Sequence, residues 1–134
     1  MEPEYIHQLE FAVRDYECDI QGIVNNANYQ HYFEHARHNF LLSKNIDFAQ
    51  LHEEGIDLIV YHVDIYYKQP LHSGDKFVVK SYFQKEGNIR VAFYQDIYRI
   101  GDDTLMTKGI ITCVAIQNGR PIRPDFLLEK LGLL

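Results

Sequence analysis

The segment that decides the fold runs from residue 29 to residue 41 and reads Tyr-Gln-His-Tyr-Phe-Glu-His-Ala-Arg-His-Asn-Phe-Leu. Its apolar side chains recur at steps of three and four residues, which places them along one face of a helix. These side chains are Tyr29, Tyr32, Phe33, Ala36, Phe40 and Leu41. Asparagine is a favoured N-cap, so the helix is expected to begin at Asn25, Asn26 or Asn28. It is expected to end near Lys44 and Asn45, which gives one long helix with an aromatic face.

The rest of the chain is dominated by a period of two, which is typical of strands. From residue 57 onward, apolar and polar residues alternate, and turn sequences stand at residues 86–88 and 101–103. The alternation predicts strands near residues 57–67, 77–83, 91–100 and 105–116, and partial alternation predicts a first strand over residues 5–16. Short helices are expected at residues 48–54 and 125–130. One long helix against an antiparallel sheet is an α+β arrangement, and the aromatic helix predicts a sheet that curls around it.

Length and composition indicate a single domain over residues 1–134, with 46% hydrophobic residues. The formal net charge of -6 argues against general nucleic-acid binding, which needs a positive surface. No apolar run approaches the roughly 20 residues that span a membrane, and the acidic N-terminus lacks the hydrophobic region of a signal peptide. Cys18 and Cys113 stand far apart, which fits a reduced compartment. We therefore expect a cytoplasmic protein that binds neither nucleic acid nor membrane.

The loop before the helix carries the most specific pattern in the chain. It reads Asp19-Ile20-Gln21-Gly22-Ile23-Val24-Asn25-Asn26-Ala27-Asn28-Tyr29. This loop resembles the signature D-x-x-G-[IV]-[VY]-x-x-x-x-Y of the 4-hydroxybenzoyl-CoA thioesterase family, and Tyr32, Phe33 and Glu34 fill the helix positions that follow. A second segment, from Val63 to Asp75, is similar to the family's central strand and its Pro-x-x-x-Gly-Asp turn. The chain is also similar to bacterial acyl-CoA thioesterases related to the Tol-Pal-associated enzyme.

The resemblance implies a hotdog fold, in which a curved antiparallel sheet wraps around one long central helix. It implies hydrolysis of acyl-CoA thioesters to free acid and CoA by a homodimer or a dimer of dimers. In this family the sheets pair edge to edge and the active site lies between subunits, so one subunit would supply Asp19 and the other much of the acyl pocket. The family implies neither a metal nor an organic cofactor.

Thioester hydrolysis needs an oxygen nucleophile and a stabilised oxyanion. A carboxylate meets the first need by direct attack or by activating water, and Asp19 is the carboxylate of the signature loop. Backbone N–H groups at a helix start meet the second need. The amides of Asn25, Asn26 and Ala27 are candidates, and the resemblance favours Asn26. Gly22 would let the backbone approach the thioester closely. Without the resemblance, an aspartate in a D-x-x-G loop is more typical of a turn-stabilising residue.

Further substrate contacts are carried over from the resemblance. They are Gly22, Ile23, Val24, Asn25, Tyr29, Glu34 and Arg90. Glu34 is expected to support the loop rather than act as a second catalytic carboxylate. Arg90 follows a turn at residues 86–88 and is the best candidate to hold a CoA phosphate. His31, His35 and His38 share the helix with Glu34, but an H-E-x-x-H pattern is missing, so a solvated or interface face is favoured over a metal site.

Two other functions stay open. The Val24-Asn25-Asn26 run is also similar to acyl-ACP thioesterases, and a pantetheine arm would enter the same slot in either enzyme. A carrier protein would need a broad basic docking patch, and none is evident in the sequence. The other alternative is a non-catalytic hotdog module that binds acyl-CoA, which would not need an acid at position 19. A dehydratase is disfavoured because its His-bearing signature is missing. The sequence leaves acyl chain length open.

Overall fold

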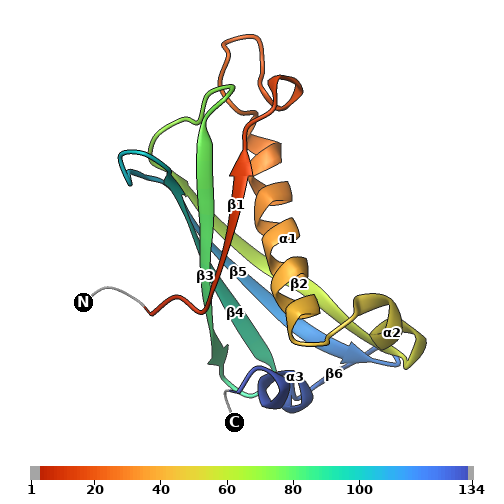
Figure 1. Ribbon diagram of the computed structural model, residues 1–134. Coiled ribbons are helices and arrows are strands. Elements are labelled where there is room, and N and C mark those ends of the chain that lie inside the picture. Colours follow the sequence, from red (N-terminus) through yellow and green to blue (C-terminus); the bar gives the residue numbers. More distant parts are fainter. Residues whose placement is uncertain (1–3, 133–134) are drawn as a thin grey trace.

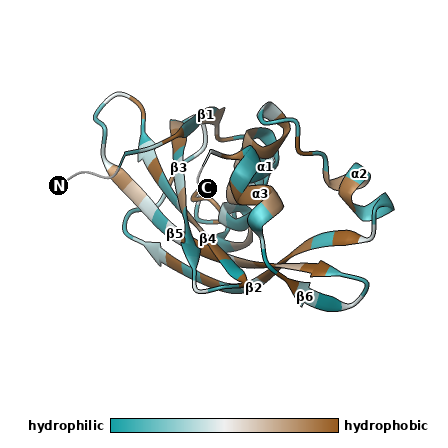
Figure 2. Cartoon of the chain, turned by 90° about the horizontal axis from the view of Figure 1, so that it is seen from below, coloured by the Kyte–Doolittle hydropathy of each residue, from teal (hydrophilic) through white to brown (hydrophobic). Residues whose placement is uncertain are grey.

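The computed structural model describes residues 4–132. Its elements, in chain order, are β1 (His7–Ala12), a 3-10 turn η1 (Asp15–Glu17), α1 (Asn26–Ser43), α2 (Phe48–Glu53), β2 (Ile56–Tyr67), β3 (Lys76–Glu86), β4 (Arg90–Arg99), β5 (Leu105–Gln117), β6 (Arg120–Ile122) and α3 (Asp125–Lys130). The strands form one antiparallel sheet in the order β1-β3-β4-β5-β2, and β6 pairs with the end of β5. Figure 1 shows α1 alongside the sheet. Figure 2, a view from below, shows the sheet curving around α1, as the sequence predicted.

The long helix buries the face that its spacing predicted. All six apolar residues of that face are at most 4% exposed. Phe33 packs against Gly109 of β5, where an added Cβ would lie 2.8 Å from the phenyl ring. Because no larger residue fits there, Gly109 sets how closely α1 approaches the sheet. Full burial of a phenylalanine stabilises a fold by about 1.5–3 kcal/mol, so this contact is one of the anchors of the helix.

Two local predictions were wrong. The first strand ends at Ala12, and residues 15–17 form a 3-10 turn instead of continuing the strand. Glu17 holds this turn, because its Oε1 accepts the backbone N–H of Arg14 at 2.8 Å and the hydroxyl of Tyr32 at 3.0 Å. The sequence also missed β6, which follows a turn at residues 118–119 and contains Pro121. Proline is tolerated there because β6 lies at the edge of the sheet.

The strand β2 leaves an apolar edge of the sheet open in the single chain. Five of its residues, Ile59, Val60, Tyr61, Tyr66 and Tyr67, are between 46% and 59% exposed. The neighbouring β5 is covered on both sides, because it lies between β4 and β2. Long apolar edges invite pairing with another strand. Within residues 4–132, no helix is long and apolar enough to cross a membrane.

Candidate active site

The signature loop folds as a short hairpin ahead of α1. The N–H of Asp19 donates to the carbonyl of Ile23, and the N–H of Gly22 donates to the carbonyl of Asp19, both at 2.9 Å. Ile20, at the tip, is 97% exposed. Gly22 has a φ of +80°, which residues with a Cβ rarely adopt. No heavy atom lies within 4 Å of a Cβ built at Gly22, so within this chain the glycine serves the turn rather than a close packing contact.

The carboxylate of Asp19 stabilises this hairpin and remains partly exposed. Its Oδ1 accepts the backbone N–H of Gln21 at 3.0 Å. The side-chain nitrogen of Gln21, in the orientation that satisfies both groups, lies 2.8 and 3.2 Å from the two carboxylate oxygens. The turn-stabilising role considered from the sequence is therefore present. These bonds also fix the direction of the carboxylate, which is what a reacting group requires.

The first turn of α1 leaves one backbone donor unused. The side chain of Asn25 caps the helix by accepting the N–H of Ala27 at 3.0 Å. The N–H of Asn25 donates to the carbonyl of Glu17, and the N–H of Asn28 donates to the carbonyl of Asn25. Of residues 25–28, only Asn26 has an amide without a hydrogen-bond partner in the described part of the chain. The sequence offered three candidate amides at this helix start, and the structure leaves Asn26 available.

Tyr67, at the end of β2, lies beside this free amide. Its hydroxyl donates to the carbonyl of Asn26 at 3.4 Å, and its ring centroid is 5.2 Å from that of Tyr29. Tyr67 is 47% exposed. Sequence reasoning assigned it no role, although its strand alternation with Val63 and Ile65 places it on the face of β2 that looks toward α1. Tyr67 therefore forms a wall of the site at the helix start.

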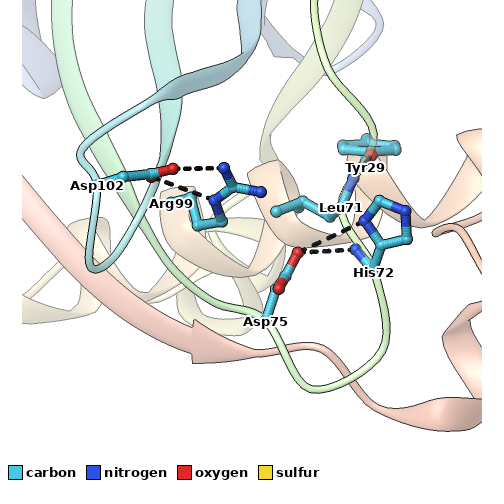
Figure 3. Close-up of polar contacts among 6 residues, drawn as sticks. All are labelled: Tyr29, Leu71, His72, Asp75, Arg99 and Asp102. Atoms are coloured by element: carbon cyan, nitrogen blue, oxygen red, sulfur yellow. Dashed lines mark hydrogen bonds and ion pairs between the residues drawn. The ribbon is translucent and has the colours of Figure 1, made fainter.

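Two of the predicted substrate contacts are buried within the single chain and support the site. Val24 and Tyr29 are each 2% exposed. The hydroxyl of Tyr29 accepts the N–H of Leu71 at 3.1 Å, as Figure 3 shows, while the N–H of Val24 donates to the carbonyl of Leu71 at 2.9 Å. Asp75 closes the same turn by accepting the N–H of His72 at 2.9 Å. The Pro70–Asp75 turn, which belonged to the second sequence motif, thus locks the signature loop to the first turn of α1.

Ile23 and Glu34 have different environments. Ile23 is half-buried and bridges to His72. Glu34 is exposed, and its Oε1 lies 3.9 Å from Nε2 of His38. It makes no hydrogen bond to the signature loop among the described residues, so its support of the loop stays a prediction. Within residues 4–132, no group of three or more His, Cys, Asp or Glu side chains is arranged to hold a metal ion.

Arg90 is remote from Asp19 within one chain. It begins β4 at the end of the sheet opposite the start of α1 (Figure 1). Its guanidinium lies over the ring of Tyr61, 4.6 Å from the centroid. Tyr61 stands at a register shift of β2, between Val60 and His62. A single chain therefore places the predicted phosphate contact and the predicted carboxylate at separate ends.

Comparison with known proteins places the chain in a family. Residues 13–131 match the thioesterase-like superfamily. A chloroplastic acyl-acyl carrier protein thioesterase of Arabidopsis thaliana is 38% identical over 128 residues, covering 92% of this chain and 66% of the relative. A putative esterase of Aquifex aeolicus is 30% identical over 120 residues, covering 89% and 92% of the two chains. The crystal structure of a 1,4-dihydroxy-2-naphthoyl-CoA thioesterase from Synechocystis superposes with a TM-score of 0.86 at 18% identity, covering 95% and 96%.

The fold and the relatives together define a thioester hydrolase of the hotdog fold. The chain belongs to the thioesterase-like superfamily, and the family prediction is confirmed at that level. It spans about two thirds, 66%, of the length of the plant relative.

Proposed function

We propose that the protein hydrolyses acyl-CoA thioesters to the free acid and CoA at the start of α1. The observation that carries the proposal is the unengaged amide of Asn26, which follows by two residues the Cys18–Val24 pair that closes the hairpin of Asp19. A helix start favours negative charge, and a free amide there suits the oxyanion of a tetrahedral intermediate. One such donor contributes about 10²–10³ in rate.

The proposed reaction uses Asp19 and the Asn26 amide in complementary roles. The thioester carbonyl accepts the N–H of Asn26, while Asp19 either attacks the carbonyl carbon or takes a proton from an attacking water. Collapse of the intermediate breaks the carbon–sulfur bond, and the CoA thiolate leaves and takes up a proton. If Asp19 attacks directly, water then hydrolyses the mixed anhydride. Gly22, Ile23 and Asn25 would line the thioester end of the site.

The open edge of β2 supports a homodimer, alone or within a dimer of dimers. Antiparallel pairing of β2 with a second copy would cover the exposed residues Ile59, Val60 and Tyr66. Arg90 is level with Ile59, near the start of β2, because both residues pair with Val114 of β5. Antiparallel pairing would run this end of one β2 toward the Tyr67 end of the other, so Arg90 of the second copy would approach the site at Asp19. This arrangement reconciles the separation of the two residues within one chain with a role for Arg90 at the CoA phosphates.

An acyl-ACP substrate is the second candidate. The plant relative at 38% identity is an acyl-acyl carrier protein thioesterase, and both carriers present the acyl group on a pantetheine arm. The net charge of -6 argues against docking an acidic carrier, which is why we favour CoA. The narrower likeness to 4-hydroxybenzoyl-CoA thioesterases, with an aromatic acyl group, is a further prediction within the same proposal.

One substrate panel separates these possibilities. The same acyl groups are presented on CoA, on acyl carrier protein and on pantetheine, and thiol release is followed for each. Faster turnover of the CoA esters supports the proposal. Turnover of the carrier-protein esters alone would favour the second candidate. Saturable binding of acyl-CoA without hydrolysis would instead indicate a non-catalytic acyl-CoA-binding module.

A further inference from the structure

We propose that Arg37 forms a polar subsite for the acyl group and selects acyl chains that carry an oxygen atom remote from the thioester. A terminal carboxylate or hydroxyl is the chemistry that fits. This inference rests on the proposed function, because it concerns the far end of the same substrate.

The first support is the shape of the molecule along α1. Two adjoining hollows follow the side of α1 that faces β2, one starting at Gln30 and the other reaching Phe48. Glu34, Arg37 and Val60 border both hollows, so they form one groove. Gln30 lies one helical turn beyond the free amide of Asn26. Arg37 stands eleven residues after Asn26 (37 − 26), which is about 16 Å along the helix.

The second support is that Arg37 is held in place by the core. Its Nη1 donates to Oε1 of Gln95 at 3.0 Å. Gln95 is fully buried, and its Nε2 donates to the carbonyl of Phe33 at 3.0 Å and to Oγ of Ser81 at 3.3 Å. These two bonds orient the amide oxygen of Gln95 toward Arg37. The guanidinium also lies 6.0 Å from the ring centroid of Phe93. Arg37 is therefore fixed at the floor of the groove rather than free at the surface.

The third support is the unmet charge of Arg37. Burial lowers the pKa of the guanidinium, yet arginine remains charged at neutral pH. Ion pairs of at most 4.0 Å occur elsewhere in the described residues, but none involves Arg37. A guanidinium has five donors, and Gln95 takes one of them. The unused donors of this partly buried guanidinium are not closed off by the core, so a carboxylate or hydroxyl oxygen in the groove can accept from them.

The other polar groups of the groove do not fill this need. Glu34 is exposed and lies nearest to His38, so its charge is screened by water. Burial raises the pKa of Cys113 to about 11, which keeps this thiol neutral at physiological pH. His38 and Gln30 also line the groove, and burial lowers the pKa of His38. The apolar part of the walls includes Val60 and Phe93. The groove thus combines an apolar path with one fixed cation, which suits an aliphatic chain that ends in an oxygen.

The test compares three CoA esters at several matched chain lengths: the unsubstituted acyl, the terminal hydroxyl and the terminal carboxylate. The readout is the ratio of kcat/KM for each oxygenated ester to that for the unsubstituted ester. In the parent protein this ratio should reach about 10–100 at the fitting length. Arg37→Met should bring it close to one, and Arg37→Lys should keep part of it. Arg123→Met, at an exposed arginine outside the groove, is the matched control and should behave as the parent.

Three results would overturn the inference. A parent kcat/KM ratio near one at every chain length would show that Arg37 does not bind the far end of the acyl group. An equal loss of kcat/KM on all three esters in Arg37→Met would show the same. Dissociation of the oligomer in Arg37→Met, seen by sedimentation, would assign Arg37 to a subunit contact. If the parent hydrolysed none of the esters, the proposed function would fail separately. Calorimetric binding of the same esters to parent and Arg37→Met would then still decide whether Arg37 prefers the oxygenated chain.

Discussion

Replacing Asp19 by asparagine isolates the charge of the proposed catalytic group from its structural role. The carboxylate now accepts the N–H of Gln21 at 3.0 Å, and an asparagine Oδ1 can accept the same bond. Asp19→Asn should therefore preserve the hairpin and remove only the negative charge. Asp19→Ala removes both. Comparing the two variants separates the turn-stabilising role of Asp19 from its proposed chemistry.

The expected magnitudes differ enough to be told apart. One hydrogen bond of this kind contributes about 0.5–1.5 kcal/mol to the free energy of unfolding. Asp19→Ala should lose about that amount, a fall in Tm of about 2–9 °C, while Asp19→Asn should stay within about 0.5 kcal/mol of the parent. Loss of a general base or nucleophile lowers the rate by about 10²–10⁴, or about 2.7–5.5 kcal/mol of barrier. Both variants should therefore lose turnover, whereas only Asp19→Ala should lose stability.

The assay is thiol release from the best CoA ester, with thermal unfolding and sedimentation measured on the same samples. Asp47→Asn is the matched control, because Asp47 caps α2 by accepting the N–H of Ala49 at 2.9 Å and lies outside the site. It should keep the parent's rate. A folded Asp19→Asn variant that turns over its substrate at near the parent rate would refute the catalytic assignment and leave Asp19 as a turn residue only.

Four further outcomes are expected. The protein should sediment as a dimer or larger at micromolar concentration because the edge of β2 is open, and a stable monomer would contradict this. Arg90→Ala should raise KM for CoA esters with kcat unchanged, and change little for a pantetheine thioester; equal losses on both would assign Arg90 to the fold. Tyr29→Phe should cost about 1–3 kcal/mol in denaturant unfolding, because the N–H of Leu71 loses its acceptor; unchanged stability would contradict that. Burial raises the pKa of Cys113 to about 11, so native Cys113 should resist alkylation at pH 7–8 until unfolding, and fast labelling would be inconsistent with this burial.

The long helix and the main strands could be predicted because their signals are local. The three- and four-residue spacing from Tyr29 to Leu41 is set by the helix alone, and its predicted face is the buried face. The alternation of Phe77, Val79 and Phe83 predicts β3 in the same way. Of the candidate site, the position of Asp19 in the loop and the cap at Asn25 followed from residue type and spacing.

What the sequence missed depends on contacts between distant residues. The 3-10 turn at residues 15–17 is stabilised by Glu17, whose carboxylate accepts the hydroxyl of Tyr32 in α1. The placement of Tyr67 beside Asn26 joins residues 41 positions apart. The sequence also did not show which amide at the start of α1 stays free. That depends on a distant contact, because the N–H of Asn25 donates to the carbonyl of Glu17. None of these pairings produces a periodic pattern in the sequence.

Gln95 shows how such a hidden contact still leaves a signal. Its alternation with Phe93 and Ile97 places it on the inward face of β4, where an amide is costly unless its hydrogen bonds are made. The partners that satisfy it come from α1 and β3, at Phe33 and Ser81. Its remaining oxygen is then directed at Arg37, a cation that the core itself does not neutralise. In this protein the inward amide of Gln95 thereby joins the core to Arg37, which borders the groove along α1.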